Sequence, residues 1–543
     1  MDEPATAILS GFGVPPSGGT SSEAATGAQI NATDPTAILP SGTGDIVPRA
    51  RRFDKRLLFA PLALAVIVLG GFFGYRYFTP AKQIESIAVL PFENKSSDAD
   101  SDYLSDGLAE SLIYRLSQLP DLKVSPTSSV FRYKGKETDP QTVAKELGVD
   151  SVMTGRITQR GDSLTISVNL VDTRNGKSLW GEQYERKMSE LLNTQREIAS
   201  EITNKLQLKL SGAGAQTLAK KYTDNNEAYQ FYLKGKYHYA KRTKEEILKG
   251  IEDFEQAIAL DPNFALAYVE ISDSYSTMPA YPYMSPKEAF PKAKAAAQKA
   301  LAIDPTLAEA HSALGFSLAV YDWNWAEAKR EFEKAIELNP NLSFAHFRYG
   351  WNYLLPVGST KEAIRELKHS LELERMSLVA NAILAIVYAD DRQNEQALTQ
   401  ARKIYDLEPN FPTGRWALSQ AFIVNGMYAE AIELNEESLQ TAPASQLFLR
   451  FAGYAYAKSN RRKDAEAILN KFGELSKTEY VMSYRVANIY AALGEKDKAF
   501  AELEKAFENH DWELFRLKVD PLMDPLRDDP RFKAMLKRMG LPE

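Results

Sequence analysis

The sequence contains no cysteine and only five histidines. The absence of cysteine excludes disulfides, thiolate zinc sites, iron–sulfur clusters, cysteine nucleophiles and a lipidated cysteine. No two histidines are three or four residues apart, which argues against a metal centre on one helix. We therefore expect no metal, no cofactor and no catalytic residues. Basic residues are not in excess either: 65 Lys and Arg stand against 72 Asp and Glu, so no nucleic-acid partner is expected.

Residues 1–48 lack Lys and Arg, and half of them are Gly, Pro, Ser or Thr. Such a segment has too little apolar surface to offset the entropy of ordering, so we expect a disordered cytoplasmic head. Within it the tetrapeptide Thr-Ala-Ile-Leu occurs twice, beginning at Thr6 and at Thr36. Phosphorylation of these two threonines would create anionic docking sites. Chance similarity in a biased composition is the alternative interpretation.

One long apolar run follows. No charged residue occurs between Leu57 and Tyr75, and the basic flank 49–56 precedes the run. Nineteen residues of helix extend about 28 Å, close to the thickness of the hydrocarbon core of a bilayer. We expect a transmembrane helix at 57–78, and a cleaved signal peptide fits less well because the run starts so late. The basic flank places the N-terminus in the cytoplasm and residues after about 80 outside it, which would be the periplasm if the span lies in a bacterial inner membrane.

Residues 83–210 have the pattern of a compact α/β domain. A short apolar run at Ser86–Phe92 is typical of a buried strand, and helical spacing of leucines follows at Leu104–Leu116. The strictly alternating run Leu164–Leu170 predicts a strand with one buried face. A helix at about Ser189–Leu210 closes the domain.

The runs SIAVLPFEN, YLSDGLAESLIYRLSQL, FRYKGKETDPQTVAKELGVDSVMTGRI and LVDTRNGKSLWGEQYER resemble the FlgO/TolB-N-like domain. This resemblance implies a bacterial membrane protein in which the domain lies between a transmembrane helix and tetratricopeptide repeats (TPR). In that type of protein a Ser/Thr kinase, an adenylate cyclase or a winged-helix regulator often precedes the membrane. Here about 50 residues without such a domain stand in its place.

The second half of the sequence is periodic. Small residues recur at intervals of 43, 35, 35, 34, 34, 34 and 34 residues. These positions are Gly250, Ala293, Ala328, Ala363, Ala397, Ala431, Ala465 and Ala499. A small residue is needed where the two helices of a repeat approach most closely. The phrases AIALDPN, LAIDPT and AIELNPN resemble the 34-residue TPR, so we expect an all-α TPR solenoid of about eight repeats at 226–519.

Stacked TPR units present a groove lined by the first helix of each repeat, which implies a protein or peptide partner. His311 and His346 fall at equivalent positions of successive first helices and are candidate groove residues. Trp323 and Trp325 are either an exposed contact patch or part of the core. The tail 520–543 is expected to cap the last repeat.

The fold class expected from the sequence is thus an α/β module followed by an all-α TPR solenoid, with one N-terminal transmembrane helix. The function expected is that of a membrane-tethered, non-enzymatic scaffold that recruits a partner protein outside the cytoplasm. The alternative is the receptor or sensor component of a kinase- or cyclase-associated signalling system that lacks its own catalytic domain.

Overall fold

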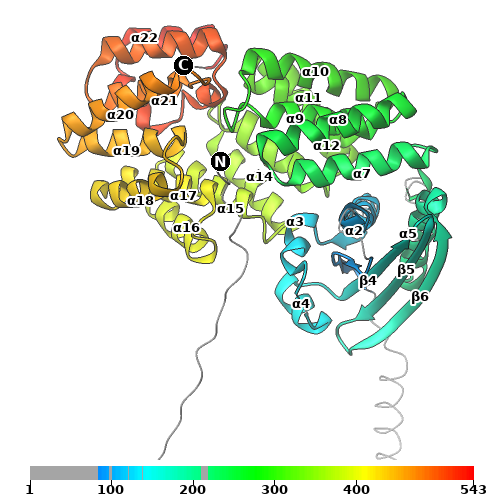
Figure 1. The fold of residues 1–543 in the computed structure, drawn as a ribbon. Coiled ribbons are helices and arrows are strands. Elements are labelled where there is room, and N and C mark those ends of the chain that lie inside the picture. The colour runs from blue at the N-terminus through cyan, green and yellow to red at the C-terminus, as the bar shows by residue number, and fades with distance from the viewer. Residues whose placement is uncertain (1–83, 97–100, 120, 137, 209–217, 543) are drawn as a thin grey trace, which may run out of the picture. The chain divides into compact units, whose positions relative to one another are not determined.

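The computed structural model describes residues 84–96, 101–119, 121–136, 138–208 and 218–542 (Figure 1). The expected head, basic flank and transmembrane helix, and with them Thr6 and Thr36, lie outside the described residues. Within the described part of the chain, no helix combines the length and apolarity that a membrane span requires.

The N-terminal domain is built on one sheet. Its strands are β1 (Ser86–Val89), β2 (Glu93–Asn94), β3 (Lys123–Val124), β4 (Ser151–Arg160), β5 (Ser163–Asp172) and β6 (Lys177–Lys187). They lie in the order β3-β1-β4-β5-β6, and β2 also pairs with β4. The pairs of β1 with β3 and β4 are parallel, whereas β4, β5 and β6 form an antiparallel meander. The helices are α2 (Asp102–Ser117), α3 (Thr127–Val130), α4 (Pro140–Leu147) and α5 (Leu191–Lys205), with short 3₁₀ turns η2 (Phe131–Tyr133) and η3 (Met188–Glu190).

Local sequence explains these elements. The alternating residues Leu164, Ile166 and Leu170 of β5 are fully buried on one face of the sheet. Gly161 turns the chain from β4 into β5 with a φ of +60°, a conformation that glycine adopts without strain. The Asp139 side chain caps α4 by accepting a hydrogen bond from the Thr142 backbone N–H at 2.9 Å. The expected strands and helices are present, although α5 is shorter than expected.

The C-terminal part consists of eight helix pairs. The first helices of the repeats are α7 (Asn226–Ala240), α9 (Ala265–Thr277), α11 (Ala308–Val320), α13 (Ser343–Arg348) with the π-helical turn η4 (Tyr349–Leu354), α15 (Leu378–Asp390), α17 (Pro412–Val424), α19 (Gln446–Lys458) and α21 (Ser483–Ala492). The second helices are α8 (Lys244–Leu260), α10 (Pro286–Ile303), α12 (Trp325–Leu338), α14 (Thr360–Leu373), α16 (Asn394–Leu407), α18 (Tyr428–Thr441), α20 (Arg462–Leu475) and α22 (Lys496–Asn509). The extra residues of the second repeat lie between α9 and α10.

The small residues of the repeat pattern lie inside these pairs. All eight positions are buried, and each alanine among them is fully buried. A β-carbon added to Gly250 would lie 2.9 Å from the Gly235 carbonyl oxygen, so α7 and α8 cross too closely for any side chain there. The period thus reflects a steric constraint on helix packing.

The sheet domain packs on the first repeat. Helix α2 lies along α7, and a β-carbon added to Gly107 would come within 2.8 Å of Leu233 Cδ2. Glu110 of α2 pairs with Lys236 of α7 at 2.9 Å. The apolar face that α7 would otherwise leave exposed at the end of the array is therefore covered by the sheet domain.

A first prediction concerns the small positions. Replacing Ala431 by Leu in α18 should lower the free energy of unfolding by about 1–3 kcal/mol, because the fully buried site has no room for three more carbon atoms. Ala429→Leu, two residues earlier in the same helix but exposed, is the matched control and should leave stability unchanged. Chemical denaturation of both variants measures the difference. Equal free energies of unfolding for the two variants would contradict the steric explanation of the small positions.

Candidate functional site

The inner face of the repeats is formed by their first helices, and the chain's own tail lies on it. After α22 the chain forms the 3₁₀ helices η5 (Trp512–Arg516) and η6 (Pro521–Leu526), then helix α23 (Pro530–Arg538). The tail residues Leu514, Phe515 and Leu522 are fully buried. Residues 511–526, here called the tail segment, therefore belong to the core of the solenoid.

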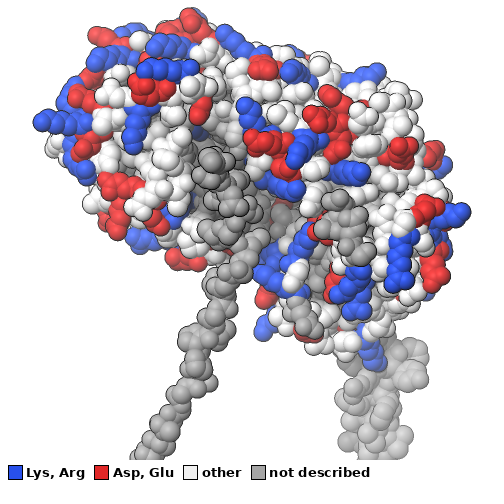
Figure 2. Space-filling view, in the orientation of Figure 1, with Lys and Arg blue, Asp and Glu red and all other residues white. Residues whose placement is uncertain are grey.

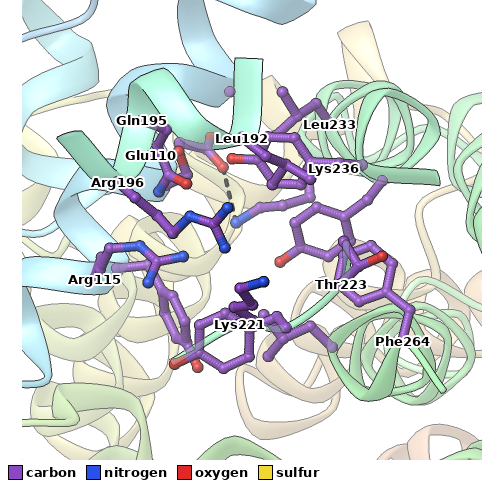
Figure 3. Close-up of a pocket in the computed structure, with 17 residues that line it drawn as sticks. Glu110, Arg115, Leu192, Gln195, Arg196, Lys221, Thr223, Leu233, Lys236 and Phe264 are labelled. Carbon is purple, nitrogen blue, oxygen red and sulfur yellow. Dashed lines mark ion pairs between the residues drawn. The ribbon is translucent and has the colours of Figure 1, made fainter. Parts of the chain in front are cut away.

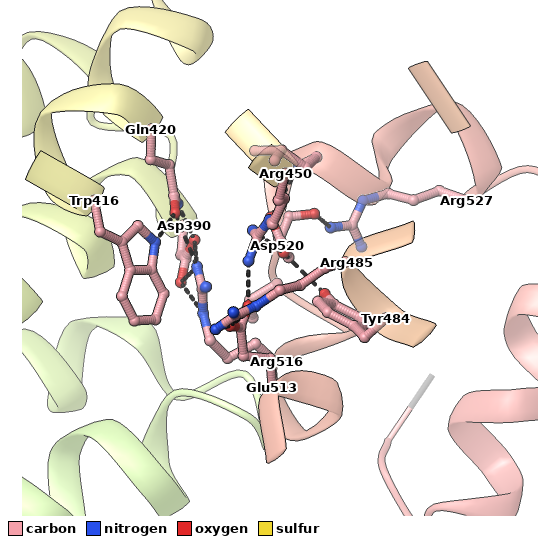
Figure 4. A network of polar contacts seen from close by, with 12 residues as sticks. Asp390, Trp416, Gln420, Arg450, Tyr484, Arg485, Glu513, Arg516, Asp520 and Arg527 are labelled. Carbon is pink, nitrogen blue, oxygen red and sulfur yellow. Dashed lines mark hydrogen bonds and ion pairs between the residues drawn. The ribbon is translucent and has the colours of Figure 1, made fainter. Parts of the chain in front are cut away.

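Arg516 anchors the tail segment to the middle repeats. Its guanidinium forms an ion pair with Asp390 of α15 at 2.7 Å and donates to Gln420 of α17 at 3.3 Å (Figure 4). It also lies over the rings of Trp351 and Trp416, at 5.1 and 5.4 Å from their centroids. The cation is enclosed by two aromatic faces and one carboxylate, an arrangement that suits guanidinium.

Two carboxylates of the tail segment bind arginines of the last repeats. Glu513 accepts from Arg485 Nε at 2.8 Å and also pairs with Arg450. Asp520 accepts from the Tyr484 hydroxyl at 2.8 Å and pairs with Arg450 at 3.3 Å (Figure 4). These partners lie on the first helices α19 and α21.

The charges of this network balance. Three arginines (450, 485 and 516) face three carboxylates (390, 513 and 520), and all six residues are buried. Burial alone would raise the pKa of Glu513, but the attraction of Arg485 and Arg450 outweighs it, so the pKa is lowered and the carboxylate stays ionised. Buried ions are costly to desolvate, and the removal of one partner leaves the other unpaired.

Beyond the network, the end of the chain reaches the third repeat. His510 Nδ1 lies 2.8 Å from the Tyr321 carbonyl oxygen, and the ring stacks on Trp323 at 4.6 Å. Trp325 Nε1 donates to the Met539 carbonyl at 2.7 Å. Trp323 and Trp325 therefore contact the end of the chain and do not form an exposed patch.

The structure corrects the expected limit of the repeats and part of the role of the tail. The last repeat helix ends at Asn509 and not near 519, and Glu513 and Arg516 beyond it contact the first helices of earlier repeats. The remaining residues contact the last repeat: η6 packs on α21, and Arg538 of α23 pairs with Glu504 of α22 at 2.7 Å. Periodicity did not indicate the inner-face segment, because its contacts are made with distant repeats.

His311 and His346 have equivalent surroundings. Nδ1 of His311 lies 2.6 Å from Glu331 of the second helix, and Nε2 lies 3.0 Å from the Pro305 carbonyl oxygen. His346 contacts Glu366 and Pro340 in the same way, at 2.7 and 3.0 Å. Both rings thus bridge the two helices of their own repeat and the turn before it, and these contacts use both ring nitrogens. Their role in partner binding stays a prediction.

The sequence contained a weak signal for the buried arginines. Arg450 and Arg485 interrupt apolar stretches, FLRFAGYAYA and SYRVANIYAA, at positions where the repeat pattern buries side chains. A charge in such a stretch indicates a buried partner. The partner carboxylates could not be identified from the sequence, since they are tens of residues away.

Two apolar side chains on the first helices remain exposed. Phe344 and Val379, each the second residue of its helix in repeats four and five, are 46% and 44% exposed. On the face shown in Figure 2, acidic and basic residues are interspersed without a large patch of one sign.

Comparison with known proteins gives two family matches. Residues 82–201 match the family described as HilA/YgeH-like transcriptional regulator, second domain, and residues 481–509 match the tetratricopeptide repeat. The TPR prediction is thereby confirmed for the last repeat, whereas the FlgO/TolB-N-like resemblance is not confirmed.

One curated relative and several solved structures are similar to parts of the chain. A putative adenylate cyclase 3 of Rhizobium meliloti (strain 1021) is 31% identical over 193 residues, 36% of this chain and 32% of that protein. The chain thus spans about a third of the length of this relative. Pseudomonas aeruginosa PilF is 20% identical over 39% of this chain and 95% of its own, with a TM-score of 0.29. YrrB, titled a TPR protein with an unusual peptide-binding site, is 20% identical over 36% of this chain and 95% of its own, with a TM-score of 0.25.

A second prediction tests the buried network. Arg516→Met should lower the free energy of unfolding by about 3–5 kcal/mol, because Asp390 would remain buried without its cation. Arg531→Met removes an exposed arginine from the same tail and should leave the denaturation midpoint unchanged. The double variant Arg516→Met with Asp390→Leu should recover much of the loss. A double variant no more stable than Arg516→Met would contradict the pairing argument.

A third prediction concerns pH. Burial raises the pKa of Asp511 to about 7, although hydrogen bonds from Tyr480 and the Tyr484 backbone oppose this. The folded state therefore holds a proton that the unfolded state releases near pH 4. The contribution of Asp511 to stability is full below pH 4 and is lost as the pH rises towards 7, at up to roughly 1.4 kcal/mol per pH unit.

The measurement for Asp511 is the free energy of unfolding of the wild type and of Asp511→Asn between pH 4 and 8. The wild type should lose stability relative to the variant as the pH rises to 7. A constant difference across this range would contradict the raised pKa.

Proposed function

We propose that this chain is a protein-interaction scaffold whose repeats bind a short segment of a partner on the inner face. The observation that carries the proposal is that the first helices of repeats four to eight already bind a segment of the chain itself, residues 511–526, whose two 3₁₀ helices insert side chains between them. The TPR match at residues 481–509 supports the same function, since such repeats bind peptides.

The unoccupied part of the first helices is the binding surface of this scaffold. Because the tail segment covers the inner face around Trp351, Trp416 and Arg450, a partner contacts what remains exposed, above all Phe344 and Val379. Phe344 stacks on Phe347 at 5.7 Å and carries Arg348 over its ring at 4.2 Å, so its position is set before a partner arrives. An aromatic anchor of this kind often dominates binding energy.

Tethering to a membrane is part of the proposal. The charge-free run Leu57–Tyr75 and the basic flank before it support a single span with the repeats outside the cytoplasm. The scaffold performs no catalysis of its own in this proposal.

A fourth prediction tests the exposed surface. The full chain, carrying an affinity tag, is crosslinked in cells, and the crosslinked proteins are identified. Phe344→Ala with Val379→Ala should reduce recovery of the specific partner roughly tenfold, the loss typical of one interface anchor. Leu407→Ala removes an equally exposed apolar residue from the second helix α16 and should recover as much partner as the wild type. Equal recovery by both variants would refute the proposed surface.

A second candidate function is favoured by one finding. The 31% identity to a putative adenylate cyclase over 193 residues supports a sensor that acts with a separately encoded signalling enzyme. The crosslinking experiment separates the candidates, because this one requires a cyclase or kinase among the recovered proteins. Phosphate on Thr6 or Thr36 in the same sample would favour it further.

A further inference from the structure

A cavity lies where the sheet domain, the connecting segment and the first repeat meet. Its walls come from α2, α5, α7, residues 221–223 and the start of α9, and its volume is about 30 Å³ (Figure 3). This is enough for one small chemical group. The cavity is separate from the inner face of repeats four to eight.

The cavity contains a buried cation without a counter-ion. Arg115 of α2 is 4% exposed, and its guanidinium donates through one terminal nitrogen to the carbonyl oxygens of Leu218 and Lys220, at 2.9 and 2.8 Å. Its Nε has no hydrogen-bond partner. Within the described part of the chain, no carboxylate forms an ion pair with Arg115. A buried charge of this kind is costly unless an anion compensates it.

Further basic groups point into the same space. The guanidinium of Arg196 lies beside Arg115, and it also donates to Asn193 Oδ1 (Figure 3). The amines of Lys221 and Lys236 line the same space, but Lys221 is exposed and forms an ion pair with Asp224 at 2.9 Å. The one carboxylate among the lining residues, Glu110, is engaged by Lys236 at 2.9 Å. Burial lowers the pKa of the Arg115 guanidinium, and the neighbouring charge of Arg196 acts in the same direction. The cavity therefore has an excess of positive charge at its centre.

Polar groups without partners complete the lining. The Gln195 side chain is 2% exposed and its Oε1 has no hydrogen-bond partner. The buried Tyr229 hydroxyl lies beside Ser111 and makes no well-aligned hydrogen bond. A half-turn of the Gln195 amide presents N–H donors to the cavity, and the tyrosine hydroxyl is a donor as well. Two guanidinium groups with amide and hydroxyl donors suit an oxyanion, whose oxygens accept several charge-assisted hydrogen bonds.

We propose that this cavity is a binding site for a small oxyanion group, a phosphate or a carboxylate, held by Arg115 and Arg196 with Gln195 and Tyr229. The bound group touches α2, α5 and α7 at once and so stabilises the sheet domain on the first repeat. The site does not depend on the partner surface proposed above.

The test uses the purified full chain and two probes, inorganic phosphate and acetate, against chloride at equal ionic strength. Calorimetric titration and thermal denaturation measure binding. The wild type should bind phosphate, acetate or both at one site per chain, with a midpoint of unfolding that rises with probe concentration. Binding of one probe alone identifies the phosphate or the carboxylate as the group recognised.

Arg196→Gln should weaken binding at least tenfold, through loss of a charge-assisted pair of hydrogen bonds. Arg196 is only partly buried, so this variant is chosen over Arg115→Met, which removes a core side chain. Arg186→Gln removes a comparable partly exposed arginine outside the cavity and should bind as the wild type does. The proposal is overturned if neither probe binds in preference to chloride, or if the two variants bind equally well.

Discussion

The arrangement of the last five repeats depends on buried ion pairs between the first helices and the segment that follows the final repeat. Arg516 with Asp390, and Glu513 with Arg450 and Arg485, join residues that a repeat array by itself would leave apart. Open solenoids are held by contacts between neighbours only. Here the tail segment contacts the first helices of repeats four to eight, and His510 just before it contacts the third repeat, so these repeats share one core.

The apolar faces at the two ends of the repeat array are covered by different parts of the chain. Terminal repeats expose an apolar face that must be covered for solubility. At the start, α7 packs on α2 of the sheet domain, and the ion pair of Glu110 with Lys236 fixes their register. At the end, α23 covers α22. The sheet domain thus caps the solenoid, and the oxyanion cavity lies within this capping interface.

Much of the architecture could be predicted because it arises from local constraints. The 34-residue spacing of small residues identified the helix pairs, since Ala431 and its equivalents are the residues that helix crossing requires to be small. The alternation of apolar and polar residues in β5 and the capping residue of α4 are local signals of the same kind. Each determines the structure of residues only a few positions away. The FlgO/TolB-N-like resemblance of the sheet domain is not confirmed, and residues 82–201 match the HilA/YgeH-like regulator domain.

The site was predicted only in outline, and the reason is physical. By itself the sequence determined that repeats would form and that their first helices would line one face. The reason is that the residues which specify the pairing of two helices are less than one repeat apart in the sequence. Only the tertiary structure decided what lies on that face. The ion pairs that hold the tail segment on that face join residues 63 and 126 positions apart in the sequence. No local pattern specifies which buried carboxylate pairs with which buried arginine. The same applies to Arg115, an ordinary helical arginine in the sequence, which becomes an unpaired cation only when three elements close around it.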